Sequence, residues 1–320
     1  MLVFSPRFPT TIPSHSPSLG RALQGARTAV GLVAALALSN AGCSDGGGSG
    51  NGGGGAGGSG TTSTTITDAP PGWILAWSDE FNGADGSAPD PVRWTAALGG
   101  DGWGNEERQY YTDDPANVRI EGGALVITAT KEGAGAHSCW YGTCLYTSAR
   151  LYTKGKLERR HGRFEARIQV PSGQGMWPAF WLLGSNIDLV GWPGCGEIDI
   201  MEHVGSEPGI VHGTLHGPGY SAGASLTDLY TLPDGQAFKD ESHVFAVEWE
   251  ANVVRFYVDD TLYHTRTPAD LPAGGQWVFE QPFYILLNVA VGGKWPGDPD
   301  ASTVFPQSMK VDYVRLYERP

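Results

Sequence analysis

The sequence predicts an all-β domain made of two packed antiparallel sheets, and three observations lead to this fold class. The 320 residues include 47 glycines and 22 prolines, a composition typical of many short strands joined by turns. Runs of alternating apolar and polar residues recur from residue 71 to residue 320, and no stretch of comparable length has helical periodicity. A region of this length fits one β-sandwich or barrel without a second domain.

Residues 1–43 are interpreted as an export signal. Arg21 and Arg27 precede an apolar run from Ala29 to Leu38. This run is too short to span a bilayer, so it fits the hydrophobic part of a signal peptide.

The end of this segment predicts a lipid anchor. Ala41 and Gly42 directly before Cys43 resemble the lipobox of bacterial lipoproteins, in which the cysteine is lipidated. Asn40 stands where that motif has a leucine. We expect an exported protein whose membrane contact is a lipid on Cys43, at the outer membrane or cell surface. Ordinary secretion is the alternative.

Residues 44–69 predict a flexible tether that precedes a domain at residues 70–320. Residues 46–60 contain 11 glycines, and a threonine-rich stretch follows them. Such a segment cannot bury enough apolar surface to fold.

The charge restricts the partners. The formal charge of −13, from 34 acidic and 21 basic side chains, opposes binding to nucleic acid or to an anionic membrane surface. We therefore expect a neutral or small ligand. Separately, a monomer is expected.

Nine runs within the domain are predicted to contain strands. Turn residues such as Gly122-Gly123, Asp259-Asp260 and Gly292-Gly293 separate strands within or between these runs. The runs cover residues 117–130, 162–170, 176–183, 197–204, 210–216, 243–249, 253–258, 283–291 and 309–317.

Side-chain parity within these runs predicts a core face and a ligand face. Every second residue from Phe164 to Val170 is apolar, so this strand is expected to have one core face and one solvent-facing polar face. Trp177 and Trp181 share a face at a spacing of about 13 Å, which suits stacking of two or more sugar rings. Core packing is the alternative for either tryptophan.

The cysteines predict one small disulfide loop. Cys139 and Cys144 can pair in an exported protein, whereas Cys195 has no evident partner. A zinc site is the competing interpretation, but no Cys-x-x-Cys motif or neighbouring histidine pair supports it.

The stretch 196–203, GEIDIMEH, contains three acids that would not all lie on the same face of a regular strand. Glu197 and Asp199 point to one side of a strand and Glu202 to the other, because side chains alternate. A β-bulge at Ile200-Met201 would bring all three to one face. Carboxylates on one face repel one another and raise the pKa of at least one of them, as the proton donor of a glycosidase requires. A solvent-facing acidic strand or a calcium site is the alternative.

The residues around these acids resemble the catalytic signature of glycoside hydrolase family 16 in its bulged, laminarinase-like form. The run 192–202 reads WPGCGEIDIME, and six further segments agree in order: 77–81, 103–111, 146–150, 176–183, 287–293 and 311–315. The resemblance covers residues 73–318. It implies a concanavalin-like β-jelly-roll sandwich with a substrate cleft on its concave sheet.

The resemblance also implies roles for individual residues. Glu197 would be the nucleophile, Glu202 the general acid/base and Asp199 the group that orients the nucleophile. The implied activity is retaining endo-hydrolysis of β-1,3-glucan without a cofactor, and action on mixed β-1,3-1,4-glucan stays open. The glucan subsites would contain Asn105, Arg150, Trp177, Trp181 and, at the rim, Trp295. His216 shares a face with His212 on the next predicted strand and is expected to hydrogen-bond near the acids.

Asp312 predicts a metal site. It shares parity with Val314 and Leu316, which puts its carboxylate on the expected core face, where an unpaired charge is costly. Family 16 enzymes often carry structural calcium far from the cleft, and the resemblance implies a site formed by Glu80, a backbone carbonyl near Gly123, and Asp312. A salt bridge to an arginine is the alternative.

Three other functions compete with the glucanase interpretation. A non-catalytic glucan-binding protein on the same fold would lack the acids, which are present here. A metal-dependent oxygenase of the cupin kind would use His212 and His216, but the sequence has no His-x-His followed by glutamate. A family 16 enzyme for agar, carrageenan or xyloglucan is the third. Arg150 and Lys294 alone do not make an anion-binding cleft for sulfated chains.

Overall fold

The computed structural model describes residues 69–320. The predicted export signal, the predicted lipidation site at Cys43 and nearly all of the predicted tether lie outside the described residues. Within residues 69–320, no helix is both long enough and apolar enough to cross a membrane.

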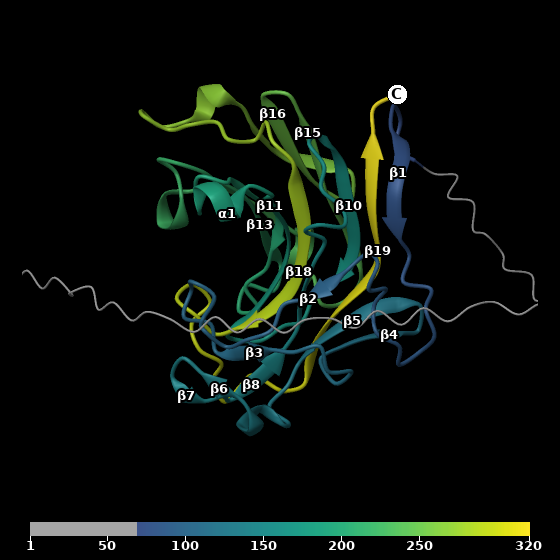
Figure 1. Ribbon diagram of the computed structural model, residues 1–320, viewed down its shortest axis with the longest axis vertical. Helices are drawn as coiled ribbons and strands as arrows, with labels where there is room; N and C mark the ends of the chain where they lie inside the picture. The colour runs from purple at the N-terminus through teal and green to yellow at the C-terminus, as the bar shows by residue number, and fades with distance from the viewer. Residues whose placement is uncertain (1–68) are drawn as a thin grey trace, which may run out of the picture. The chain divides into compact units, whose positions relative to one another are not determined.

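Two large antiparallel sheets pack face to face in this part of the chain (Figure 1). The first sheet has eight strands, and β1 (Ile74–Asp79) runs beside β19 outside its main order. That order is β17 (Thr261–Arg266), β16 (Val253–Val258), β15 (His243–Glu250), β10 (Gly162–Gln169), β19 (Gln307–Glu318), β5 (Ala124–Ala129) and β4 (Val118–Glu121).

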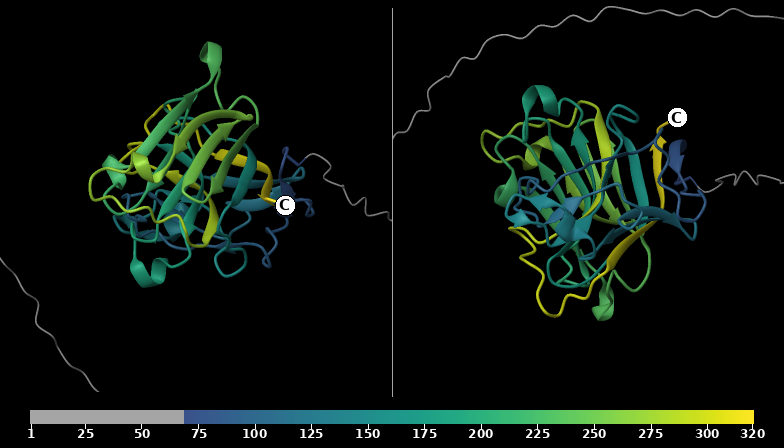
Figure 2. Two further views of the ribbon diagram at one scale, coloured as in Figure 1. Left: turned by 90° about the horizontal axis from the view of Figure 1, so that it is seen from above. Right: turned by 60° about the horizontal axis from the view of Figure 1, so that its bottom comes forward.

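The second sheet has seven strands and carries the three acids on β12. Its order is β14 (Leu226–Thr231), β13 (Ile210–His216), β12 (Glu197–Glu202), β11 (Met176–Gly184), β18 (Phe283–Val291), β9 (Arg150–Tyr152) and β2 (Thr95–Ala96). Figure 2 shows the two layers from two further directions.

Short elements complete the domain. β3 (Gln109–Tyr111) pairs in parallel with β8 (Tyr146–Ser148), and β6 (Ser138–Cys139) forms a hairpin with β7 (Gly142–Thr143). The helical elements are α1 (Ile187–Val190) and four 3-10 helices, η1 (Ala134–Ala136), η2 (Ala222–Ala224), η3 (Pro233–Gly235) and η4 (Pro268–Asp270). The predicted all-β, two-sheet fold is therefore confirmed.

Each of the nine predicted runs contains at least one strand, and the run 117–130 contains two, β4 and β5. Three strands of six residues, β1, β14 and β17, were not predicted. Each pairs with a neighbour on one side only, and most of their side chains are exposed or half-buried, so none shows clear apolar alternation.

The core lies between the sheets and is filled by alternate residues of their strands. On β10, Phe164, Ala166 and Ile168 are each 0% exposed, as their parity predicts. On β12, Ile198 and Ile200 face the same core. Burial of each large side chain contributes about 1.5–3 kcal/mol to the free energy of unfolding.

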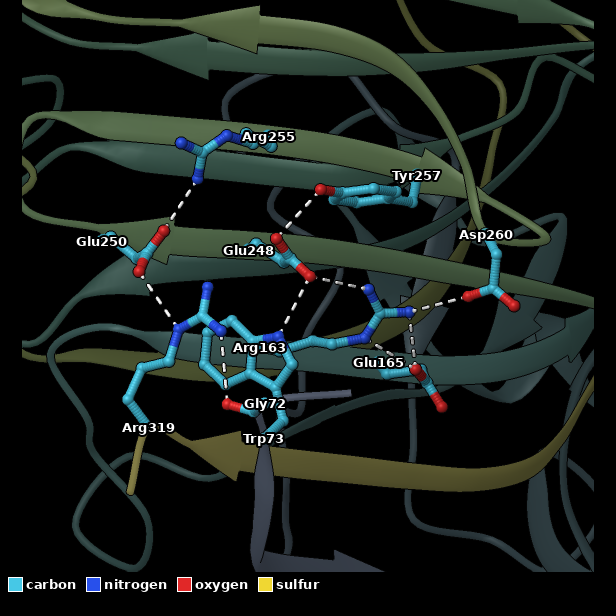
Figure 3. A network of polar contacts seen from close by, with 10 residues as sticks. All are labelled: Gly72, Trp73, Arg163, Glu165, Glu248, Glu250, Arg255, Tyr257, Asp260 and Arg319. Carbon is cyan, nitrogen blue, oxygen red and sulfur yellow. Dashed lines mark hydrogen bonds and ion pairs between the residues drawn. The ribbon is translucent and has the colours of Figure 1, made fainter. Parts of the chain in front are cut away.

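The opposite face of β10 is partly accessible to solvent at Arg167 and Gln169 but buried at Arg163 and Glu165, so the predicted solvent-facing polar face is wrong for its first half. Arg163 and Glu165 are 2% and 5% exposed. The Arg163 guanidinium donates hydrogen bonds to Glu165 and to Glu248, and the Tyr257 ring lies 5.2 Å from it (Figure 3). The Trp73 indole also donates to Glu248 at 3.1 Å. Long side chains from neighbouring strands cover this face, which one strand's pattern cannot reveal.

Asp312 also lies elsewhere than predicted. The register between β10 and β19 shifts so that consecutive β10 residues pair with Tyr313 and Val311, leaving Asp312 as the extra residue of a bulge. Val311 and Val314 are both buried, while Asp312 is half-buried and pairs with Arg167. The carboxylate therefore does not face the core.

Candidate active site

A β-bulge in β12 places the three acids on one face of the second sheet. Asp199 pairs with Thr214 of β13 and Glu202 pairs with His212, so two residues of β12 oppose one of β13 between them. The register with β11 shifts at the same point. The two bulged residues, Ile200 and Met201, are buried in the core. The predicted bulge is confirmed at the predicted position.

Burial changes the ionisation of all three acids. Asp199 and Glu202 are 4% and 8% exposed, and the Glu197 side chain is 16% exposed. Burial, followed by the charge of Asp199, raises the pKa of both Glu197 and Glu202 to about 8. Burial also raises the pKa of Asp199 well above its ordinary value. Protons are therefore retained in this group near neutral pH.

His216 connects two of the acids. Its Nε2 lies 3.2 Å from Oδ2 of Asp199 and 3.6 Å from Oε1 of Glu197. The backbone N–H of Ala222 donates to Nδ1 at 3.2 Å, so Nδ1 is an acceptor and Nε2 carries the proton of the neutral ring. The Nε2–H of the neutral ring thus faces the acids, but Oδ2 of Asp199 has no hydrogen-bond partner among the described residues.

The same three residues have the spacing of a metal site. One ligand atom from each of Glu197, Asp199 and His216 lies within 4.8 Å of the others. A metal on Nε2 would need its lone pair, which leaves the proton on Nδ1 facing the Ala222 N–H. Because two donors would then oppose each other, the arrangement fits hydrogen bonding better than metal ligation.

The predicted tryptophan pair lies beside the acids on β11. The Trp177 indole N–H donates to Oε1 of Glu202 at 3.1 Å. The Trp181 indole N–H donates to Oδ1 of Asn288 at 2.8 Å. Both rings are half-buried, which leaves part of each ring available to a ligand.

Arg150 extends this aromatic surface. Its guanidinium carbon lies 4.8 Å from the ring centroid of Trp181 and 4.8 Å from that of Trp103, a residue that sequence analysis did not select. The positive charge of Arg150 also lowers the pKa of Glu197. Arg150 therefore belongs to the same site as the acids.

Asn105 and an unpredicted acid, Glu107, lie on the adjoining loop. The Asn105 side-chain amide donates to Glu107 at 3.5 Å, and Gln109 and Tyr111 donate to its other oxygen at 2.6 and 3.1 Å. Glu107 is 4% exposed, and its pKa is raised by burial and lowered by the charge of Arg150. The sequence offered only a weak indication that Glu107 belongs to the site. It precedes Gln109 and Tyr111, whose side chains can donate hydrogen bonds, by two and four residues.

Two exposed tryptophans flank the acids. Trp295 is 45% exposed, and its ring centroid lies 5.4 Å from that of Trp177 and 5.0 Å from that of His212. Trp192 is 46% exposed and lies 5.8 Å from the ring of His216. Trp295 was predicted at the rim of the substrate site. Trp192 was not predicted to bind substrate, although it is as exposed as Trp295 and also lies beside a histidine.

The cysteines pair as predicted. Cys139 and Cys144 form a disulfide with a Cα–Cα distance of 5.1 Å. Cys195 is free and buried, and burial raises the pKa of its thiol to about 11. A neutral buried thiol of this kind is unreactive.

The residues predicted to bind calcium have other partners. Glu80 accepts hydrogen bonds of 2.9 and 2.8 Å from Arg315, and Asp312 forms an ion pair with Arg167. Each carboxylate therefore has the arginine partner of the alternative interpretation. A calcium site at Glu80, Gly123 and Asp312 stays a prediction.

The arrangement suits acid–base and nucleophilic chemistry on a sugar. Two glutamates flank a buried aspartate on one strand face, and aromatic rings lie on both sides of them. A pair of carboxyl groups can attack a sugar carbon and protonate the departing oxygen, while aromatic faces hold the sugar rings.

Comparisons with known proteins agree with this chemistry. The family model for glycosyl hydrolases family 16 matches residues 105–315. The chain is 43% identical over 265 residues to a beta-glucanase of Rhodothermus marinus, and this match covers 78% of the chain and 87% of the relative.

Solved structures resemble the whole folded part. The catalytic domain of an endo-1,3-beta-glucanase (laminarinase) from Thermotoga petrophila RKU-1 is 49% identical, with a TM-score of 0.72, and the match covers 77% of this chain and 98% of that one. The endo-beta-1,3-glucanase of Pyrococcus furiosus is 50% identical with a TM-score of 0.72, over 78% of this chain and 95% of that one.

Proposed function

Because the chain belongs to family 16 of the glycosyl hydrolases, we propose that it is a retaining endo-β-1,3-glucanase. The observation that carries the proposal is the bulge that brings Glu197, Asp199 and Glu202 to one face beside a row of tryptophans. The names of the Thermotoga and Pyrococcus structures describe enzymes that cut β-1,3-glucan, which supports the same linkage here.

In this proposal Glu197 attacks the anomeric carbon and Glu202 protonates the leaving oxygen, then activates water. The charge of Arg150 lowers the pKa of Glu197, which favours its ionised, nucleophilic form. Burial, followed by the charge of Asp199, raises the pKa of Glu202 to about 8, so near neutral pH this carboxyl holds the proton that the leaving oxygen needs. The division of roles between the two glutamates is the one that the family resemblance implies. Asp199 remains protonated between them, because burial raises its pKa well above the ordinary value.

Substrate binding is proposed to use Asn105, Arg150, Trp177, Trp181, His216 and Trp295. Neutral glucan suits their surroundings because the two cations near the acids are already engaged. Arg150 lies against two indole rings, and the Lys294 ammonium pairs with Glu106 at 3.3 Å. Sulfated galactans would need free cations, so carrageenan-type substrates are disfavoured. Agar is compared directly in the test below. Xyloglucan and mixed β-1,3-1,4-glucan are the further substrates to compare.

The test is hydrolysis by the purified protein of laminarin, barley mixed-linkage glucan, agarose and xyloglucan side by side. We expect rapid release of short oligosaccharides from laminarin, with the β-anomer formed first when products are followed by NMR. Initial formation of the α-anomer would contradict the retaining mechanism. Absence of hydrolysis with retained binding would favour a non-catalytic glucan-binding protein.

The nucleophile has its own test. Glu197→Gln should lower kcat on laminarin by at least about 10³-fold without unfolding the domain, because the covalent step loses its attacking oxygen. Glu132→Gln is the matched control, since Glu132 is exposed on a loop. Turnover by Glu197→Gln close to that of the control would end the assignment.

We further propose that the protein is exported and held at the membrane by a lipid on Cys43. The support is the apolar run followed by Ala41-Gly42-Cys43. Labelled palmitate should be incorporated by the full chain in a bacterial host and not by its Cys43→Ser variant. Equal labelling of both would contradict the anchor.

A further inference from the structure

The loop formed by residues 99–109 carries part of the proposed glucan subsites but has an unfavourable backbone. Trp103 and Glu106 have φ angles of 48° and 58°, in the left-handed region that costs most for bulky residues. The loop also contains Asn105 and Glu107, whose contacts were described above. Contacts from outside the loop must therefore stabilise this conformation.

The disulfide hairpin formed by residues 138–144 supplies such contacts. The backbone N–H of Trp140 donates to the carbonyl of Gly100 at 2.8 Å. The Trp140 indole N–H donates to the carbonyl of Glu107 at 2.8 Å, and the Tyr141 hydroxyl donates to the carbonyl of Arg108 at 2.5 Å. Three hydrogen bonds thus join one hairpin to both ends of the loop.

Packing reinforces these hydrogen bonds. The Arg108 guanidinium lies 5.1 Å from the Trp140 ring and 5.2 Å from the Tyr141 ring. A Cβ added to Gly100 would lie 2.7 Å from the Cys139 sulfur, and one added to Gly102 would lie 3.0 Å from the Trp140 ring. The loop and the hairpin therefore pack too closely for either to move alone.

The loop in turn positions the Arg150 side chain. Trp103 lies against one side of the guanidinium, and the charge of Arg150 acts on the buried Glu107 carboxylate. The backbone carbonyl of Asn105 accepts a hydrogen bond from the N–H of Lys294, next to Trp295. Displacement of the loop would move several substrate-binding side chains while leaving the acids of β12 in place.

We propose that the hairpin closed by Cys139–Cys144 is the positioning element of the glucan-binding loop 99–109, with Trp140 and Tyr141 as its positioning residues. The proposal rests on the assignment of this face as the glucan site. It makes substrate affinity depend on the hairpin, and it leaves the bond-breaking step to Glu197 and Glu202.

The experiment compares KM and kcat on laminarin for Trp140→Phe, Tyr141→Phe and the double variant Cys139→Ser/Cys144→Ser. Each single variant should raise KM about 2–10-fold, the effect of one lost hydrogen bond, with kcat within about twofold of the wild type. The double cysteine variant should raise KM at least as much. The single variants keep the test decisive if the double variant does not fold.

The matched control is Trp73→Phe on the opposite sheet. It also removes one indole N–H, the one that donates to Glu248 at 3.1 Å on the sheet that does not carry the acids (Figure 3). Trp73→Phe and Trp140→Phe should both lower the melting temperature, but only Trp140→Phe should raise KM. A merely structural role for Trp140 would change the melting temperature alone.

Binding without turnover gives the second measurement. In a Glu197→Gln background, calorimetric titration with laminari-oligosaccharides should show the same weakening for Trp140→Phe as KM does. Wild-type KM and Kd in both single variants, or a fall in kcat at unchanged KM, would overturn the inference. A wild-type protein inactive on laminarin would instead refute the proposed function, so the two failures are distinguishable.

Discussion

Replacement of Glu202 by glutamine should stabilise the protein at neutral pH. The pKa of Glu202 is raised from 4.5 to about 8, first by burial and then by the charge of Asp199. Its proton is therefore bound more tightly in the folded state than in the unfolded state. The resulting stability is fully present below about pH 4.5 and is lost as the pH rises through about 8.

The magnitude follows from these two pKa values. At pH 7 the unfolded carboxyl is almost wholly ionised and the folded one mostly protonated, which costs the folded state about 3 kcal/mol relative to acidic pH. Glutamine is neutral in both states, and its carbonyl can still accept the Trp177 N–H. Relaxation of the site reduces the value, so we expect a gain of about 1–3 kcal/mol, or about 3–10 °C in Tm.

The assay is thermal or denaturant unfolding of the wild type and Glu202→Gln at pH 4 and pH 7. The difference between the two proteins should be near zero at pH 4 and should favour the variant at pH 7, although the variant loses its proton donor and its activity. Glu132→Gln is the control, and a surface change of this kind should stay within about 0.5 kcal/mol at both pH values. A variant no more stable than the wild type at pH 7 would refute the assignment of a raised pKa.

Three further outcomes test other parts of the structure. Trp181→Ala should raise KM on laminarin about tenfold with a smaller effect on kcat, because a stacking surface is lost, and equal loss in both would contradict a binding role. Arg163→Met should lower the free energy of unfolding by about 3–5 kcal/mol, because it leaves buried acids unpaired, while KM stays at the wild-type value. If calcium binds at Glu80, Gly123 and Asp312, a chelator should lower Tm. An unchanged melting curve would mean that the ion pairs with arginine alone stabilise these two carboxylates.

The two bulges show how far parity can be interpreted. The bulge in β12 could be predicted from the sequence. Three carboxylates interrupted by an apolar pair can share one face only if one extra residue is accommodated. On β19 a bulge also occurs at Asp312, but nothing near it signals an extra residue, so its parity with Val314 and Leu316 predicted a core-facing acid. A bulge can be predicted from a sequence only when the residues on either side of it have side chains that are expected to act together on one face.

Local patterns alone determined the all-β class, most strand positions, the bulge in β12 and the shared face of Trp177 and Trp181, because side-chain alternation depends on neighbours in the chain. Only the tertiary structure decided which faces are covered, as with Arg163 beneath side chains of other strands. It also decided the partners of Arg150, since Trp103 and Glu107 reach it from a loop held by a distant hairpin. Contacts between residues far apart in the chain leave no periodic trace in either segment, and these contacts complete the site.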